Sequence, residues 1–425
     1  MSFPTGTVDA QALPKIKAQS TMAIDSVNGQ ILYDYDEENP VNVGEVSKVL
    51  TLYTVMDAIK QGQIKAEDIV PISDQAYELS QDYDLANVPL RQDFQYTVEE
   101  LMEVVAVNGA NGATLALAEF VGGGQESKFI KKMEAHLDTW GISDYKLYNS
   151  TGLASELVPK NAGTYDEGPS NQLNAKALAY ATYHLLKLNP KMTEYASQTK
   201  MTFKKDTDDP YETSSYNKIL KGQNKEYKGA TGFLIGSSKE DGNSAIFTAK
   251  RGNLSAIVVI LGADEDREDG HYSDGHKVLD YVFATYVVEH VVKKGERVSQ
   301  ISAINILEGV QTTAKLAYQE DLMLVTPIID TAPVLTYEFI PKKDYFEKER
   351  LKAPIKKDTT IGQIKIDMKD STAKFIPGAK GNHVKVGMFE TVEKANIFQK
   401  TWQGVTQTIS NSLESARQFF TNIFN

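Results

Sequence analysis

The residues with the clearest chemical potential lie in the stretch Gly44–Leu50, where Lys48 stands three residues after Glu45. A lysine in the first turn of an apolar helix needs a partner, because burying an ammonium group alone is costly. Side chains at i and i+3 share one helix face, so a serine at position 45 would let the amine take the proton of its hydroxyl. The residue is Glu45 instead, which favours an ion pair with Lys48.

Two other interpretations of this stretch are less favourable. Glu45 could act as a carboxylate nucleophile, but acyl transfer to a carboxylate would form an anhydride. Ser47 could replace the missing hydroxyl, but no lysine follows it at position 50, which is Leu50. Ser47 would also face about 160° away from Glu45 around the helix.

Composition restricts the possible classes of protein. The chain has 425 residues, which predicts more than one domain, and a formal net charge of −12, which disfavours a nucleic-acid partner. The absence of cysteine excludes disulfides, thiolate metal sites and Cys nucleophiles. His271 and His276 fall in a Gly/Asp/Ser-rich stretch that we interpret as a solvated loop, so we expect neither a metal nor a cofactor. No segment is apolar enough to cross a membrane, and the start at Met1 resembles a mature or recombinant N-terminus without a signal peptide.

The elements around Glu45 predict an antiparallel sheet covered by helices. A hairpin over 20–35 centres on Asn28-Gly29, and apolar residues at helical spacing predict a helix from Gly44 that ends before Gly62. A capping box starts another helix, with Thr97 as N-cap and Glu100 at N3. Further helices are expected over 113–120, 127–139, 172–188 and 275–292, and further strands near 227–233 and over 244–249 and 254–261.

The chain after residue 295 changes character. Short alternating strands with Pro and Gly between them predict a small all-β domain over 296–391. They are expected over 312–316, 322–326, 334–339 and 361–368. The predicted organisation is therefore an N-terminal extension (1–19), a main domain (20–295), this β domain, and a tail (392–425).

The tail has an apolar stripe at helical spacing. Such a stripe usually packs on its own domain. Its terminal position and aromatic content favour a helix lying in a membrane interface, with binding that depends little on salt. The predicted membrane-binding residues are Phe398, Trp402, Val405, Ile409, Leu413, Phe419, Phe420, Ile423 and Phe424.

Most of the chain resembles the low-molecular-mass penicillin-binding proteins, the serine D-alanyl-D-alanine carboxypeptidases of bacterial cell walls. The similarity is carried by Leu32-Tyr33, Ser47–Thr51, Tyr96–Leu101, Trp140–Ile142, Asn149–Leu153 and Tyr216–Leu220. The resemblance implies the α/β (α+β) penicillin-binding/β-lactamase-like transpeptidase fold, followed by a small all-β domain and a C-terminal amphipathic helix.

The family's chemistry rests on three motifs, and each is incomplete here. Ser-x-x-Lys supplies the nucleophile and its base, Ser-x-Asn a relay hydroxyl and an amide, and Lys-Thr-Gly a cation on a strand edge. The corresponding segments read Glu45-Val46-Ser47-Lys48, Gly109-Ala110-Asn111 and Ala230-Thr231-Gly232. No catalytic set is therefore expected to be intact, and Glu45, Lys48, Gly109, Asn111, Ala230, Thr231 and Gly232 are expected to be vestigial active-site positions.

These losses predict a catalytically inactive homologue at the extracytoplasmic face of a bacterial cytoplasmic membrane. It would bind peptidoglycan stem peptides, or act as a scaffold or regulator for a cell-wall-synthesis protein. Its tail would bind the membrane surface. The alternative is an active serine-type carboxypeptidase with unusual motifs that trims peptidoglycan stem peptides.

Overall fold

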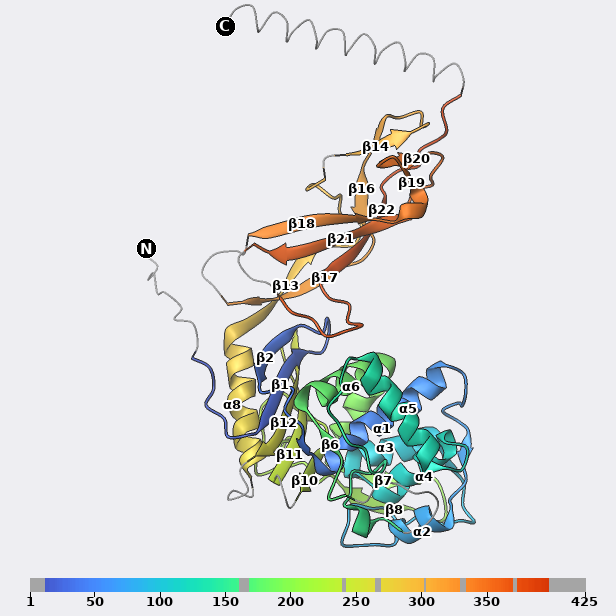
Figure 1. The fold of residues 1–425 in the computed structure, drawn as a ribbon, viewed down its shortest axis with the longest axis vertical. Helices are drawn as coiled ribbons and strands as arrows, with labels where there is room; N and C mark the ends of the chain where they lie inside the picture. The colour runs from blue at the N-terminus through green and yellow to red at the C-terminus, as the bar shows by residue number, and fades with distance from the viewer. Residues whose placement is uncertain are drawn as a thin grey trace, which may run out of the picture. The chain divides into compact units, whose positions relative to one another are not determined.

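The computed structural model describes residues 12–159, 168–238, 242–263, 269–301, 303–328, 334–369 and 373–396 (Figure 1). The described residues form two compact units. The first comprises the described residues within 12–288, 325–328 and 374–381, and the second comprises the other described residues. The boundary therefore falls before residue 295, and two segments that the sequence assigned to the β domain belong to the first unit.

A six-stranded antiparallel sheet is the centre of the first unit. Its order is β10-β11-β12-β1-β2, and β9 also pairs with β11. The predicted hairpin is confirmed as β1 and β2. The bounds are Ser20–Asp25 (β1), Ile31–Tyr35 (β2), Ala230–Gly232 (β9), Ile235–Ser238 (β10), Gly242–Arg251 (β11) and Leu254–Ala263 (β12).

Helices cover both faces of this sheet. In β12, Ile257 and Val259 point into a core shared with the larger group of helices, whereas Val258 and Ile260 point into a core shared with α8. Because side chains alternate along a strand, a strand of uninterrupted apolar residues serves both layers. The larger group includes α1 (Lys48–Lys60), α3 (Val98–Asn108), α4 (Asn111–Val121), α5 (Glu126–Thr139) and α6 (Ala175–Leu188), and α8 spans Gly270–Thr285.

Local signals place several of these elements correctly. The predicted capping box is present: Thr97 Oγ1 accepts the N–H of Glu100, and a carboxylate oxygen of Glu100 accepts the N–H of Thr97. The helix predicted over 275–292 is wrong at both ends, since α8 begins at Gly270 and Tyr286–Val292 forms strand β13. That segment is rich in valine, whose branched side chain favours strands.

Short elements connect the larger ones. The remaining helices are α2 (Asp74–Ser80), α7 (Lys191–Ala196) and the 3-10 turns η1 (Gly44–Ser47), η2 (Ser155–Leu157) and η3 (Lys343–Tyr345). The short strands are β3 (Val41–Asn42), β4 (Ile69–Val70), β5 (Tyr96–Thr97), β6 (Gln172–Leu173), β7 (Lys200–Phe203), β8 (Tyr211–Ser214) and β17 (Leu322–Pro327).

The second unit consists of β strands around its own apolar core. One sheet has the order β16-β22-β21-β18 and the other β15-β14-β20-β19. The bounds are Ile304–Leu307 (β14), Thr313–Ala314 (β15), Leu316–Tyr318 (β16), Leu335–Pro341 (β18), Phe346–Glu347 (β19), Arg350–Lys352 (β20), Thr360–Met368 (β21) and His383–Met388 (β22).

The predicted tail begins at residue 392, but residues 392–396 are part of the second unit, where Val392 is 1% exposed in the apolar core and pairs with Ile355. The membrane-binding positions from Phe398 to Phe424 are outside the described residues. In the part of the chain that is described, no helix has both the length and the apolar composition needed to cross a membrane.

Candidate active site

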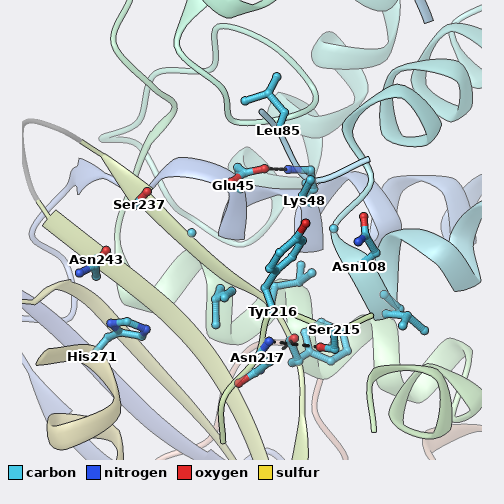
Figure 2. A pocket seen from close by; sticks show the side chains of 18 of the residues that line it. Glu45, Lys48, Leu85, Asn108, Ser215, Tyr216, Asn217, Ser237, Asn243 and His271 are labelled. Carbon is cyan, nitrogen blue, oxygen red and sulfur yellow. Dashed lines mark hydrogen bonds and ion pairs between the residues drawn. The ribbon is translucent and has the colours of Figure 1, made fainter. Parts of the chain in front are cut away.

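A cavity of about 310 Å³ lies in the first unit where the start of α1 meets the sheet edge (Figure 2). Several separate parts of the chain supply its walls, so the cavity exists only in the folded protein. They are Glu45 and Lys48, residues 83–86, residues 106–109 at the end of α3, residues 215–217, residues 233–237 at β10, Asn243 and His271.

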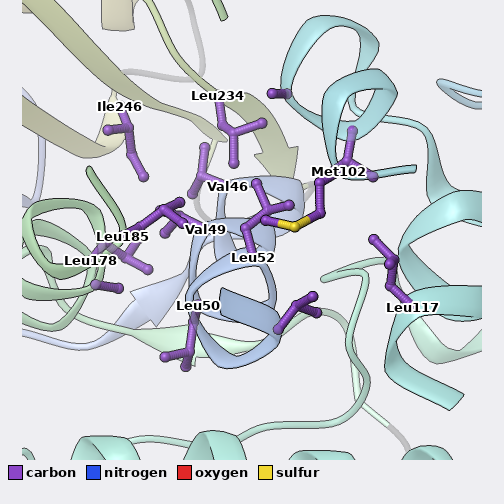
Figure 3. Packing of buried hydrophobic residues seen from close by; sticks show 14 of the residues in the cluster. Val46, Val49, Leu50, Leu52, Met102, Leu117, Leu178, Leu185, Leu234 and Ile246 are labelled. Carbon is purple, nitrogen blue, oxygen red and sulfur yellow. The ribbon is translucent and has the colours of Figure 1, made fainter. Parts of the chain in front are cut away.

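Apolar packing holds the segment that carries Glu45 and Lys48. Val46, Val49 and Leu52 are fully buried in the main core together with Leu234 and Ile246 of the sheet side (Figure 3). The turn η1 precedes α1 directly, so the carboxylate and the amine emerge on the same side of a rigid element.

The predicted ion pair is present in the cavity. Lys48 Nζ donates to Glu45 Oε1 at 2.9 Å across the i, i+3 spacing (Figure 2). The Lys48 side chain is fully buried, whereas 26% of the Glu45 side chain is exposed. The pair therefore presents its carboxylate to the cavity and keeps its ammonium behind.

Asn111 completes this arrangement from the N-terminus of α4. Its Nδ2 donates to Glu45 Oε1 at 2.9 Å and to the carbonyl oxygen of Ala86 at 3.1 Å. Burial opposes ionisation of Glu45, but the charge of Lys48 and the two hydrogen bonds outweigh it and lower the pKa of the carboxyl. Burial also lowers the pKa of Lys48, and the carboxylate of Glu45 offsets part of that effect. An ionised, hydrogen-bonded carboxylate thus occupies the position next to the Lys48 amine.

The second predicted motif is placed as expected. Gly109 ends α3 in the left-handed conformation, with φ 84°, and lines the cavity. Ala110 is fully buried and precedes α4, and Asn111 reaches Glu45.

The third predicted motif is wrong. Ala230, Thr231 and Gly232 form β9, and none of them lines the cavity. Thr231 instead contacts Thr248 on β11 through its hydroxyl, at 2.7 Å. The strand edge beside Glu45 is the following strand, and residues 234–236 there read Leu-Ile-Gly.

Glycine packing explains why the later strand is the neighbour of Glu45. A Cβ on Gly236 would lie 2.7 Å from the backbone nitrogen of Glu45, and a Cβ on Gly44 would overlap the carbonyl oxygen of Ser237. Two glycines thus allow this close approach of β10 and η1. The match to Ala-Thr-Gly selected Gly232, but Gly236 follows four residues later. Only strand register decides which of these two glycines lies beside Glu45.

Ser47 is buried away from the cavity. Its hydroxyl donates to the carbonyl oxygen of Gly44 and accepts from Asn171 Nδ2, both at 3.0 Å. These contacts give it a structural role in holding η1.

Several residues that line the cavity were not predicted from the sequence. His271, expected in a solvated loop, is in α8 with 6% exposure and lines the cavity, and burial lowers its pKa to about 4. His276 also lies in α8, where its Nε2 contacts the carbonyl oxygen of Lys225. Asn108 and Tyr216 line the cavity as well. No local pattern marks these residues, although Asn108 directly precedes the second motif.

No group of three or more His, Asp or Glu side chains in the described ranges is arranged to hold a metal ion. The lining residues offer a ligand hydrogen-bonding groups and the carboxylates of Glu45 and Asp84.

The fold is that of the penicillin-binding class of α/β proteins. The structure of a peptidoglycan synthesis regulatory factor (PBP3) from Streptococcus pneumoniae is similar with a TM-score of 0.76 and 25% identity, covering 89% of this chain and all of that one. Penicillin binding protein 5 from Haemophilus influenzae is similar with a TM-score of 0.67 and 21% identity, covering 90% of this chain and all of that one.

Residues 7–265 match the family model described as D-alanyl-D-alanine carboxypeptidase, and the chain belongs to that family. A curated relative, the D-alanyl-D-alanine carboxypeptidase DacF of Bacillus subtilis (strain 168), is 25% identical over 387 residues. That alignment covers 90% of this chain and 89% of the relative.

Proposed function

We propose that this chain is a catalytically inactive member of its family that acts at the cell envelope by binding. It would recognise peptidoglycan stem peptides or serve as a scaffold or regulator for cell-wall-synthesis proteins. The observation that carries this proposal is Glu45, whose carboxylate lies beside the buried amine of Lys48 and accepts its hydrogen bond.

Acyl transfer by the serine mechanism needs a nucleophile that the amine can deprotonate. Here the group beside Lys48 is a carboxylate with a lowered pKa, which has no proton to give. The pneumococcal relative is described as a peptidoglycan synthesis regulatory factor, which supports a regulatory role. The family membership supports an envelope location, and the tail would add binding to the membrane surface.

The direct test is acylation by a labelled penicillin, measured together with D-Ala release from an acetylated Lys-D-Ala-D-Ala peptide. We expect no penicilloyl adduct by mass spectrometry and no D-Ala above the rate without protein. Bacillus subtilis DacF, whose name states the activity, is the positive control. A stable adduct or steady release would overturn the proposal.

A restoration series makes this test sharper. Glu45→Ser alone should leave the chain far below a normal rate, because residue 109 still lacks a hydroxyl and residues 234–236 still lack a cation. Recovery of a normal rate by this single change would contradict the account of the other two positions.

The second candidate is an active D-alanyl-D-alanine carboxypeptidase that trims stem peptides, and membership in the family favours it. The same D-Ala assay distinguishes the two candidates.

A further inference from the structure

The charge that the cavity presents to a ligand is negative. Lys48 is the only lysine or arginine among its described lining residues, and it is fully buried behind the partly exposed carboxylate of Glu45. The other ionisable acid of the lining is Asp84, on the exposed loop after α2. His271 adds no charge at neutral pH, because burial lowers its pKa to about 4.

Asn108, one of the lining residues, has a buried acceptor that lacks a donor. Asn108 lines the cavity at 6% exposure, and its Nδ2 donates to Thr213 Oγ1 at 2.9 Å and to the carbonyl oxygen of Ser214 at 3.2 Å. Because a carbonyl oxygen only accepts, the second bond determines which end of the amide is nitrogen. Asn108 Oδ1 is then buried without a hydrogen bond. Such an atom is costly to leave unpaired, so it marks a place for a ligand N–H.

Two aromatic rings at the cavity can accept a cation. Tyr83 and Tyr216 both line it, and they are 72% and 58% exposed. Their π faces attract ammonium groups.

We propose that the cavity is a receptor for a peptide that brings a primary ammonium group to Glu45 and Asp84 and an amide N–H to Asn108, and that it rejects a free carboxylate. The inference rests on the proposed binding function and names its ligand class. An ammonium complements both carboxylates, whereas a ligand carboxylate would meet like charge and no accessible cation among the described lining residues.

The test uses four peptide probes that differ in two groups. Each is Nα-acetyl-Lys-D-Ala-D-Ala, with the lysine amine free or acetylated and the C-terminus as acid or amide. Isothermal titration calorimetry on the full chain at low salt measures the affinities. We expect the free amine with the C-terminal amide to bind most tightly, at least about tenfold better than the acetylated acid.

Substitutions of the two carboxylates test whether they bind the ammonium group of the probe. Asp84→Asn and Glu45→Gln should each reduce the preference for the free amine at least about threefold. Asp82→Asn is the control, because Asp82 is exposed, lies two residues away and does not line the cavity. It should keep the wild-type preference. Asp84 is also exposed, so its variant keeps the test valid if Glu45→Gln fails to fold.

Three results would overturn the inference: no binding of any probe at about 10 mM, acid forms that bind as tightly as amides, or a preference unchanged in both variants. D-Ala release from the acid probes would overturn the proposed function instead. It is read by product analysis and does not depend on the affinity ranking.

Discussion

At the residue scale, one side chain determines which charge the cavity presents. Glu45 accepts hydrogen bonds from Lys48 and Asn111. It is the counter-charge of the Lys48 ammonium, whose side chain is fully buried. The pair is asymmetric because only its carboxylate has contact with solvent. Removing one partner of a buried ion pair lowers the free energy of unfolding more when the charge that remains is the more deeply buried of the two.

This asymmetry predicts unequal effects of two substitutions. Glu45→Ala leaves a fully buried ammonium without a counter-charge and should lower the free energy of unfolding by about 3 kcal/mol or more. Lys48→Met leaves a carboxylate that keeps Asn111 and some solvent, so its cost should be about half as large. Urea denaturation of both variants measures the difference. A greater loss for Lys48→Met would contradict the orientation of the pair.

His271 provides a pH-dependent prediction. Its pKa of about 4 in the folded protein lies below the ordinary 6.5, so the stability it contributes is complete above pH 6.5 and is lost as pH falls from 6.5 to 4. The loss is about 3 kcal/mol at pH 4. His271→Gln should remove this component, so the difference in unfolding free energy between wild type and variant should shrink by that amount from pH 7 to pH 4.

Protonation of Asp25 changes the free energy of unfolding over part of the same pH range, with the opposite sign. Burial raises its pKa to about 6, so its contribution grows as pH falls below 6. It is present in both proteins and cancels in the difference. A difference that is independent of pH would show that His271 ionises normally in the folded chain.

At the element scale, the position of the strand edge depends on a glycine pair. Gly44 has a φ of 62° and touches Ser237, while Gly236 touches the start of η1. Both contacts involve backbone atoms, which cannot move away as a flexible side chain can. This approach determines which residues of the sheet edge enter the cavity.

A pair of glycine substitutions tests this contact. Gly44→Ala combines left-handed strain with overlap on Ser237 and should cost at least about 3 kcal/mol of unfolding free energy. Gly62 follows α1 with a φ of 70°, and a Cβ added there would meet no atom within 4 Å, so Gly62→Ala should cost only about 1 kcal/mol. Equal losses would mean that strain alone, and not the close approach, matters at Gly44.

At the scale of the whole molecule, the first unit depends on chain that comes late in the sequence. Ile376 is 2% exposed in the main core, and its N–H donates to the carbonyl oxygen of Gly29 at 3.0 Å. Gln30 Nε2 donates to the carbonyl oxygen of Val325 at 3.1 Å. The hairpin of β1 and β2 is therefore supported by two segments that return from beyond residue 324.

Ile376→Ala should destabilise the first unit by about 3 kcal/mol, because it leaves a cavity in a packed core. Hydrogen exchange should show lost protection in residues 20–35. Ile340→Ala is the control, since Ile340 is 40% exposed in the second unit and its loss should change stability by less than about 0.5 kcal/mol. Unchanged protection of the hairpin would contradict the assignment of 374–381 to the first unit.

The apolar stripe of the tail supports a prediction that rests on the sequence alone. The full chain should bind neutral phospholipid vesicles, and a chain ending at residue 396, which keeps the buried Val392 and Ala395, should not. Raising salt from about 50 to about 500 mM should change binding less than about twofold, because apolar burial dominates. Cosedimentation measures this, and strong salt dependence would indicate an electrostatic anchor.

The sequence by itself determined the features that depend on neighbouring residues. The hairpin at Asn28-Gly29, the capping box of Thr97 and Glu100, and the Glu45–Lys48 pair are all encoded within a few positions, so turn preferences and helical spacing suffice to predict them. The family fold followed from the order of such segments.

Only the tertiary structure decided which distant residues meet. Strand register put residues 234–236 at the cavity in place of the predicted Ala230–Gly232, and the start of α8 brought His271 from an expected loop into a buried wall. The physical reason is that register and helix position are determined by burial on both faces of the sheet and by close backbone contacts. These are properties of the packed core that no local window of sequence contains.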